Sequence, residues 1–200
     1  MYANSVLLDS DFCNMLTDID GGKINSRDLL QKVINIIGKT PYIHEYVKQH
    51  ELFDNVIIQE FIKNEEIKVL RYNEIIKNHD DKLYYFYTFS EYYTTMNNEE
   101  FIGDCFQFRK SNFNLGEIHS LIAARFLEIP LLYTNDKGAS FLANKYNTQG
   151  NKVILVSGLD LMIEYKDEGI FDRDIRRAIF AKYEKAHWKE RYKKAVGDIN

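Results

Sequence analysis

The sequence predicts an α/β fold with a central, mostly parallel sheet of four to five strands flanked by helices. Short runs of aliphatic and β-branched residues alternate with longer runs at helical spacing, the pattern of parallel βαβ units. The strands are expected at residues 5–8, 67–71, 129–133 and 153–156. With 45% hydrophobic residues and only two prolines, the chain can build a sizeable core without long linkers.

The spacing of apolar residues predicts the helices that connect these strands. Residues 27–37 form one such helix, with Ser26 as its N-cap and Gly38 after its end. Thr40-Pro41 predicts a further helix over residues 42–51, because proline is favoured in the first helical position. Other helices are expected at residues 11–16, 56–63, 115–127, 137–144 and 159–165, with one or two over 73–96.

The C-terminal residues 171–200 are predicted to be a basic helical extension packed on a domain formed by residues 1–170. From Arg173 to Lys194 there are nine Lys/Arg and three Asp/Glu, although the chain has a net charge of −4. A basic cluster can contact phosphates, and a solvated helix face explains it equally well. The stripe Ile175, Ile179, Tyr183 and Ala186 would pack on the domain, and the candidate nucleic-acid contacts are Arg173, Arg176, Arg177 and Lys182.

The cysteines and the hydropathy of the chain indicate in which cellular compartment we expect the protein. Cys13 and Cys105 form neither a disulfide framework nor a zinc pattern, and free thiols are typical of a reducing cytoplasm. Asp9 and Asp11 interrupt the only apolar run near the N-terminus, which argues against a secretory signal. No stretch approaches the roughly 18 apolar residues of a membrane span. We therefore expect a cytoplasmic protein without a membrane partner.

Acidic and polar residues follow two of the predicted strands, where parallel sheets bind ligands. Asp9 follows residues 5–8, while Thr134, Asn135 and Asp136 follow residues 129–133, and Glu117 begins a helix. Each acid alone is simply explained as a helix cap or a turn residue. Together they would repel one another unless a cation neutralises them. Mg²⁺ and Mn²⁺ prefer oxygen ligands, and such ions support phosphodiester hydrolysis.

Four short segments resemble motifs of the PIN-domain family, and they occur in the family's order. They are Val6-Leu7-Leu8-Asp9-Ser10-Asp11, Asn114-Leu115-Gly116-Glu117 with the following helix, Ile129-Pro130-Leu131-Leu132-Tyr133-Thr134-Asn135-Asp136-Lys137-Gly138-Ala139, and Val153-Ile154-Leu155-Val156-Ser157-Gly158-Leu159. The similarity covers residues 5–13 and about 112–171. It implies a PIN-like three-layer fold and a nuclease that uses Mg²⁺ or Mn²⁺ to cleave single-stranded RNA or, less often, DNA.

The resemblance implies that Asp9, Glu117 and Asp136 bind the metal. The family's second acid is a glutamate on a helix after the first strand, and Glu45 and Glu51 are both candidates. They cannot share one helix face because they are six residues apart. We prefer Glu45, with Glu51 as the alternative.

Other residues near these motifs have a supporting or a structural interpretation. Asp11, where the family often has asparagine, would add negative charge near the metal, and Thr134 and Asn135 would support the site through hydrogen bonds. His119 is either a metal ligand or, as is more common, a structural histidine. The aromatic residues 84–93 either stack on bases or, as we favour, belong to the core.

Two other functions compete with the nuclease. Asp9-Ser10-Asp11 fits the DxD opening of a haloacid-dehalogenase-like phosphatase, but Cys13 and Ser157-Gly158 depart from that family's later motifs. A non-catalytic PIN-like module that binds nucleic acid or protein is the second alternative. A toxin with an antitoxin or other protein partner is a subtype of the nuclease hypothesis, and a homodimer is compatible with the sequence.

Overall fold

The computed structural model describes residues 2–19, 25–107, 114–147, 152–182 and 186–196. Its centre is an all-parallel sheet with the strand order β3-β2-β1-β4-β5. The strands are β1 (Ser5–Leu8), β2 (Thr40–His44), β3 (Lys68–Leu70), β4 (Leu131–Tyr133) and β5 (Ile154–Val156). This confirms the predicted α/β class, and the arrangement is consistent with a PIN-like three-layer fold. The order reverses between β1 and β4, where parallel sheets typically bind ligands.

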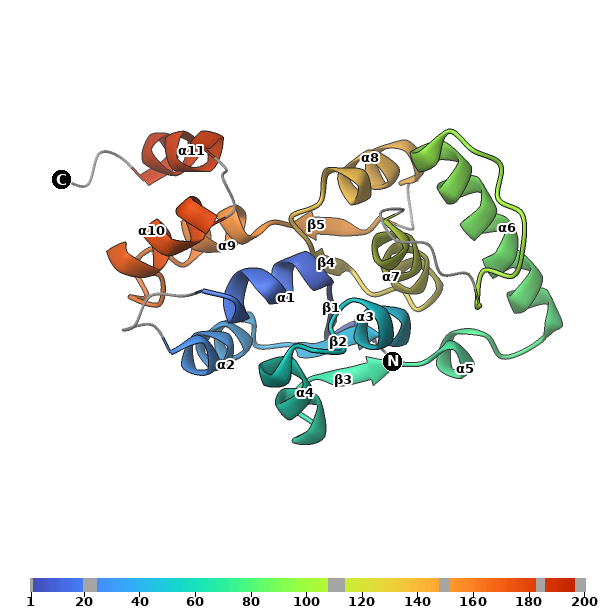
Figure 1. Cartoon of the computed structure of the whole chain (residues 1–200), viewed down its shortest axis with the longest axis horizontal. Coiled ribbons are helices and arrows are strands. Elements are labelled where there is room, and N and C mark those ends of the chain that lie inside the picture. Colours follow the sequence, from blue (N-terminus) through green and yellow to red (C-terminus); the bar gives the residue numbers. More distant parts are fainter. Residues whose placement is uncertain (1, 20–24, 108–113, 148–151, 183–185, 197–200) are drawn as a thin grey trace.

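Helices cover both faces of the sheet (Figure 1). One face is covered by α1 (Ser10–Thr17), α2 (Ser26–Ile37), α4 (Val56–Lys63) and α9 (Gly158–Glu164). The helices α10 (Arg173–Lys182) and α11 (Ala186–Val196) extend the same hydrophobic core, and α11 packs against α9 and α10. The other face is covered by α6 (His79–Asn97), α7 (Leu115–Phe126) and α8 (Lys137–Tyr146). The short helices α3 (Glu45–His50) and α5 (Tyr72–Ile75) follow β2 and β3.

The central strand β1 separates two hydrophobic cores. Val6 and Leu8 point into the core beneath α1 and α2, whereas Leu7 points into the core beneath α6 and α7. All three side chains are buried. A continuous apolar run is therefore what a strand covered on both faces requires.

The prediction of a helix beginning at residue 42 is wrong, because residues 40–44 form β2 and the helix begins only at Glu45. The missing N–H of Pro41 is tolerated since the pairing with β3 starts one residue later, at Tyr42. Pairing with two neighbours and burial of Ile43 outweigh the local helix-start signal. The N-cap of α2 is Asn25 rather than Ser26, since its side chain accepts two backbone N–H groups.

The predicted C-terminal helical extension forms two helices, α10 and α11. Ile179, Trp188 and Tyr192 are buried in the same core as α1 and α2, so both helices pack on the domain. Tyr183 of the predicted stripe lies outside the described residues. None of the described helices is both long and apolar enough to cross a membrane.

The aromatic region divides between core and surface. Tyr85, Phe89, Tyr92 and Tyr93 on α6 are buried, so this part of the region belongs to the core as we favoured. On the same helix Tyr84 and Tyr87 are exposed, at 63% and 65%.

Candidate functional site

Three acidic residues lie at helix N-termini, at or beside the edge of the sheet where the strands end. Asp9 follows β1 and is the N-cap of α1, while Asp136 follows β4 and is the N-cap of α8. The Asp136 carboxylate accepts hydrogen bonds from the backbone N–H groups of Gly138 and Ala139. Glu117 lies in the first turn of α7. The partial positive charge of each helix N-terminus stabilises an adjacent carboxylate.

A fourth acid, Glu51, joins this group from the C-terminal end of α3. Its Oε1 accepts a hydrogen bond from the Gly116 backbone N–H at 3.0 Å. A Cβ atom at residue 116 would lie 2.3 Å from Glu51 Oε2, closer than real contacts allow. The glycine before Glu117 is therefore required for Glu51 to approach α7.

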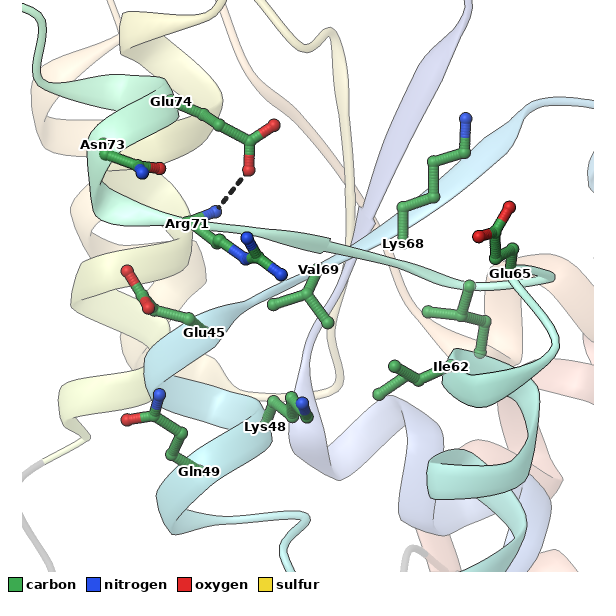
Figure 2. A pocket seen from close by; sticks show the side chains of 11 residues that line it. Glu45, Lys48, Gln49, Ile62, Glu65, Lys68, Val69, Arg71, Asn73 and Glu74 are labelled. Carbon is green, nitrogen blue, oxygen red and sulfur yellow. Dashed lines mark hydrogen bonds between the residues drawn. The ribbon is translucent and has the colours of Figure 1, made fainter.

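The structure places Glu45 elsewhere, contrary to our preference for it. Glu45 accepts a hydrogen bond from the Tyr72 backbone N–H and lines a cavity of about 760 Å³ beside β3, with Lys48 and Arg71 (Figure 2). The two glutamates occupy opposite ends of α3, and six residues of helix span about 9 Å. Only Glu51 is thereby brought to Asp9 and Glu117.

Burial and mutual repulsion raise the pKa values of three of these acids. The pKa of Asp9 lies well above its ordinary value because the carboxyl is buried and faces Glu117, Asp11 and Glu51. Burial and the proximity of Glu51, Asp136 and Asp11 raise the pKa of Glu117 to about 8. Burial also raises the pKa of Glu51, against the hydrogen bonds from Ser10 and Gly116. The acids thus form one electrostatically coupled group.

Each of these three carboxylates has one buried oxygen without a hydrogen-bond partner. The atoms are Asp9 Oδ1, Glu51 Oε2 and Glu117 Oε2. Among the described residues, no lysine or arginine forms an ion pair with any of the three. Leaving such a group unpaired costs about 1–3 kcal/mol, and more when it is charged. We call Asp9, Asp11, Glu51, Glu117 and Asp136 the acidic cluster.

The donor set fits a hard divalent cation, which takes carboxylate oxygens. Among the described residues, no group of three or more His, Cys, Asp or Glu side chains is placed to hold a metal ion as the side chains stand. Binding therefore requires the carboxylates of the acidic cluster to turn toward a shared ion. The unpartnered oxygens can bind the ion directly, whereas Asp9 Oδ2 and Glu51 Oε1 accept hydrogen bonds that a full rotation would break.

Thr134 and Asn135 connect the acidic cluster to the sheet. The Thr134 hydroxyl donates to Asp9 Oδ2 at 3.0 Å, while the Asn135 backbone N–H donates to both oxygens of Asp11 at 3.0 and 2.9 Å. Asn135 Oδ1 accepts a hydrogen bond from the Gly158 backbone N–H at 2.7 Å. These bonds fix the ends of β1, β4 and β5 relative to one another.

His119 occupies a structural environment inside the aromatic core. It is fully buried, its Nδ1 lies 2.7 Å from the Tyr85 hydroxyl, and its ring stacks on that of His44. Burial lowers the pKa of His44 to about 3, so that ring is neutral. The stack packs α7 against the start of α3, the two helices that carry Glu117 and Glu51.

The four candidate nucleic-acid contacts divide into two pairs. Arg176 donates to the Phe171 carbonyl and lies over the Tyr192 ring, and Lys182 pairs with Asp18 at 2.5 Å. These two side chains anchor α10 to the rest of the fold. Arg173 and Arg177 are exposed, so they are the pair available to phosphate.

Burial of Asp9 weakens the phosphatase alternative. In DxD phosphatase chemistry the first aspartate attacks the phosphorus. Asp9 has no exposed surface, and one of its oxygens accepts the Thr134 hydroxyl. An incoming phosphate cannot reach this carboxylate as it stands.

Comparisons of the chain with family models, curated proteins and solved structures gave no match. The class of protein that the observations define is thus an α/β protein with an all-parallel sheet and an acidic cluster beside its carboxyl edge.

Proposed function

We propose that this protein is a divalent-metal-dependent nuclease that hydrolyses phosphodiester bonds in single-stranded RNA. The observation that carries the proposal is the convergence of buried carboxylates with unpartnered oxygens at Asp9, Glu51 and Glu117. Such an arrangement is costly on its own and becomes favourable when Mg²⁺ or Mn²⁺ is present.

The residues have separate roles in this proposal. Asp9, Glu117 and Asp136 hold the ion, and Glu51 replaces Glu45 as the fourth acid. A bound Mg²⁺ or Mn²⁺ supplies charge neutralisation and water activation for phosphodiester hydrolysis. Thr134 and Asn135 keep Asp9 and Asp11 in place through their hydrogen bonds.

The exposed positive charges of the protein favour a nucleic acid as the substrate. The acidic cluster repels a free polyanion, so binding requires the cation together with basic residues elsewhere. Arg173 and Arg177 are exposed and can neutralise phosphates. The choice of RNA over DNA rests on the family resemblance.

The decisive experiment is cleavage of labelled single-stranded RNA and DNA with Mn²⁺, Mg²⁺ or EDTA. We expect cleavage of RNA with either metal and none with EDTA. Asp9→Asn keeps the size of the side chain but removes the charge that holds the cation, so the rate should fall at least a hundredfold. Asp28→Asn, the same change on an exposed residue of α2, is the matched control and should cleave normally.

Folding has to be monitored separately from cleavage. Burial raises the pKa of Asp9, so the asparagine variant should melt no lower than the parent in EDTA. Cleavage that survives EDTA, or an Asp9→Asn variant as fast as the parent, would overturn the metal-nuclease mechanism.

A further inference from the structure

A second pocket, of about 550 Å³, opens beside the acidic cluster, and Glu51 forms part of its wall. The opposite wall comes from α1, where Asn14 and Thr17 line the pocket. Ser10, Asn14 and Thr17 lie on one face of this helix because they are spaced by four and three residues. Since Ser10 directly follows Asp9 and the pocket is lined by Glu51 as well as Asn14 and Thr17, this polar face leads from the acidic cluster into the pocket.

The pocket presents a fixed hydrogen-bond donor. Asn55 Nδ2 donates to Asn14 Oδ1 at 3.0 Å and to Thr17 Oγ1 at 2.7 Å. These bonds orient the Asn14 amide with its oxygen toward Asn55. The Nδ2 group of Asn14 is left as a donor, with no acceptor among the described residues.

An acceptor and an apolar wall complete the lining. Asp54 is exposed and forms no hydrogen bond or ion pair with another described residue, so its carboxylate is open to a ligand. Val56, which is 70% exposed, and the half-buried Ile57 supply an apolar surface. The pocket therefore combines a donor, a charged acceptor and an apolar surface.

This chemistry selects a neutral planar ligand rather than a phosphate. Asp54 and Glu51 repel anions, whereas a carboxylate accepts hydrogen bonds from amino groups such as N4 of cytosine. The Asn14 amide can donate to a neighbouring carbonyl, and the aliphatic wall can pack against the apolar face of a ring. Cytosine and guanine offer both an exocyclic amino group and a carbonyl, whereas uracil and hypoxanthine lack the amino group.

We propose that this pocket binds an unpaired cytosine or guanine base next to the phosphodiester held at the acidic cluster. The inference rests on the proposed nuclease function for its biological setting. The recognition itself rests only on Asn14, Asp54, Val56 and the pocket that they line.

Binding of nucleosides in EDTA tests the pocket independently of the metal and of catalysis. Saturation-transfer NMR would be recorded with millimolar cytidine, uridine, guanosine or inosine. We expect the parent protein to bind cytidine about tenfold more tightly than uridine, and guanosine about tenfold more tightly than inosine. In Asp54→Asn these ratios should fall below twofold, because the amide replaces a charged acceptor with a mixed donor and acceptor. Asp28→Asn should keep the tenfold ratios.

Cleavage mapping on an unstructured RNA of mixed sequence is the second measurement. With Mn²⁺, the parent should cut beside cytosine or guanine, and Asp54→Asn should cut with this bias reduced at least fivefold. A nucleoside preference without any cleavage would refute the nuclease and leave the pocket proposal standing. Cleavage accompanied by equal binding of all four nucleosides, by no nucleoside binding, or by an unchanged preference in Asp54→Asn would overturn the pocket proposal alone.

Discussion

Replacing Glu117 by glutamine should stabilise the metal-free protein while abolishing its response to metal. The Glu117 carboxyl is buried, and Glu51, Asp136 and Asp11 repel its negative charge, so its pKa is about 8. Glutamine has nearly the same shape but no charge. Its amide can also donate to the unpartnered Oε2 of Glu51, if the side chain turns toward it.

The size of the effect follows from the proton that Glu117 must bind on folding. At pH 7 the unfolded carboxyl, with its ordinary pKa of 4.5, is ionised, whereas the folded carboxyl is protonated. Taking up that proton at pH 7 costs about 3 kcal/mol, which is the upper limit of the gain expected from glutamine. For a chain of 200 residues this corresponds to a rise in Tm of roughly 6–12 °C.

Thermal melts between pH 5 and pH 8 in EDTA would measure this effect. The folded state of the parent binds more protons than the unfolded state in this range, so its stability should fall as the pH rises. This contribution is fully present below pH 4.5 and is lost as the pH rises toward about 8. Glu117→Gln should show a flatter dependence, and the exposed control Glu91→Gln should follow the parent.

Addition of Mn²⁺ distinguishes the loss of metal binding from a general change in the stability of the protein. The parent should gain Tm with Mn²⁺, because a ligand that binds only the folded state stabilises it. Glu117→Gln should gain at most a small fraction of that rise. A variant that melts below the parent in EDTA, or that gains as much from Mn²⁺, would refute the reasoning.

Three further changes test other parts of the fold. Gly116→Ala places a Cβ atom 2.3 Å from Glu51 Oε2, so the Mn²⁺ concentration needed for half of the Tm rise should increase at least tenfold. Replacing Arg173 and Arg177 together by glutamine should reduce the slope of log K against log salt for single-stranded RNA by about 1.4; an unchanged slope would leave them as solubilising charges. Trp188→Ala should lower the free energy of unfolding in urea by about 3–5 kcal/mol, and a loss below about 1 kcal/mol would contradict its place in the core.

Most of the fold was predictable because the apolar pattern and the local signals agree. The bounds of α4 match the predicted residues 56–63, and β1 matches residues 5–8. Strand β2 was missed because Thr40-Pro41 is a strong local signal for a helix start. What makes residues 40–44 a strand is their parallel pairing with β1 and β3, and those partners are distant in sequence.

The sequence predicts those residues of the candidate site whose positions follow from the ends of predicted strands and the start of a predicted helix. Asp9 and Asp136 follow strands, and Glu117 begins a recognisable helix, so their gathering could be foreseen. Glu51 could not be separated from Glu45 without the true start of α3. The signal that identifies Glu51 is the glycine at residue 116, whose backbone N–H it meets, and this contact spans 65 residues of sequence.

The energetics of the acidic cluster favour the binding of a cation. Unpaired oxygens on Asp9, Glu51 and Glu117 together cost several kcal/mol at about 1–3 kcal/mol each, within a total stability of about 5–15 kcal/mol. A cation present at a hundred times its Kd stabilises the folded state by about 2.7 kcal/mol. A non-catalytic protein that bound the ion would gain the same stability, so thermal melting alone does not distinguish a scaffold from a nuclease. RNA binding that persists in EDTA, without cleavage in Mn²⁺, would therefore favour the scaffold, whereas metal-dependent stability together with metal-dependent cleavage would favour the nuclease.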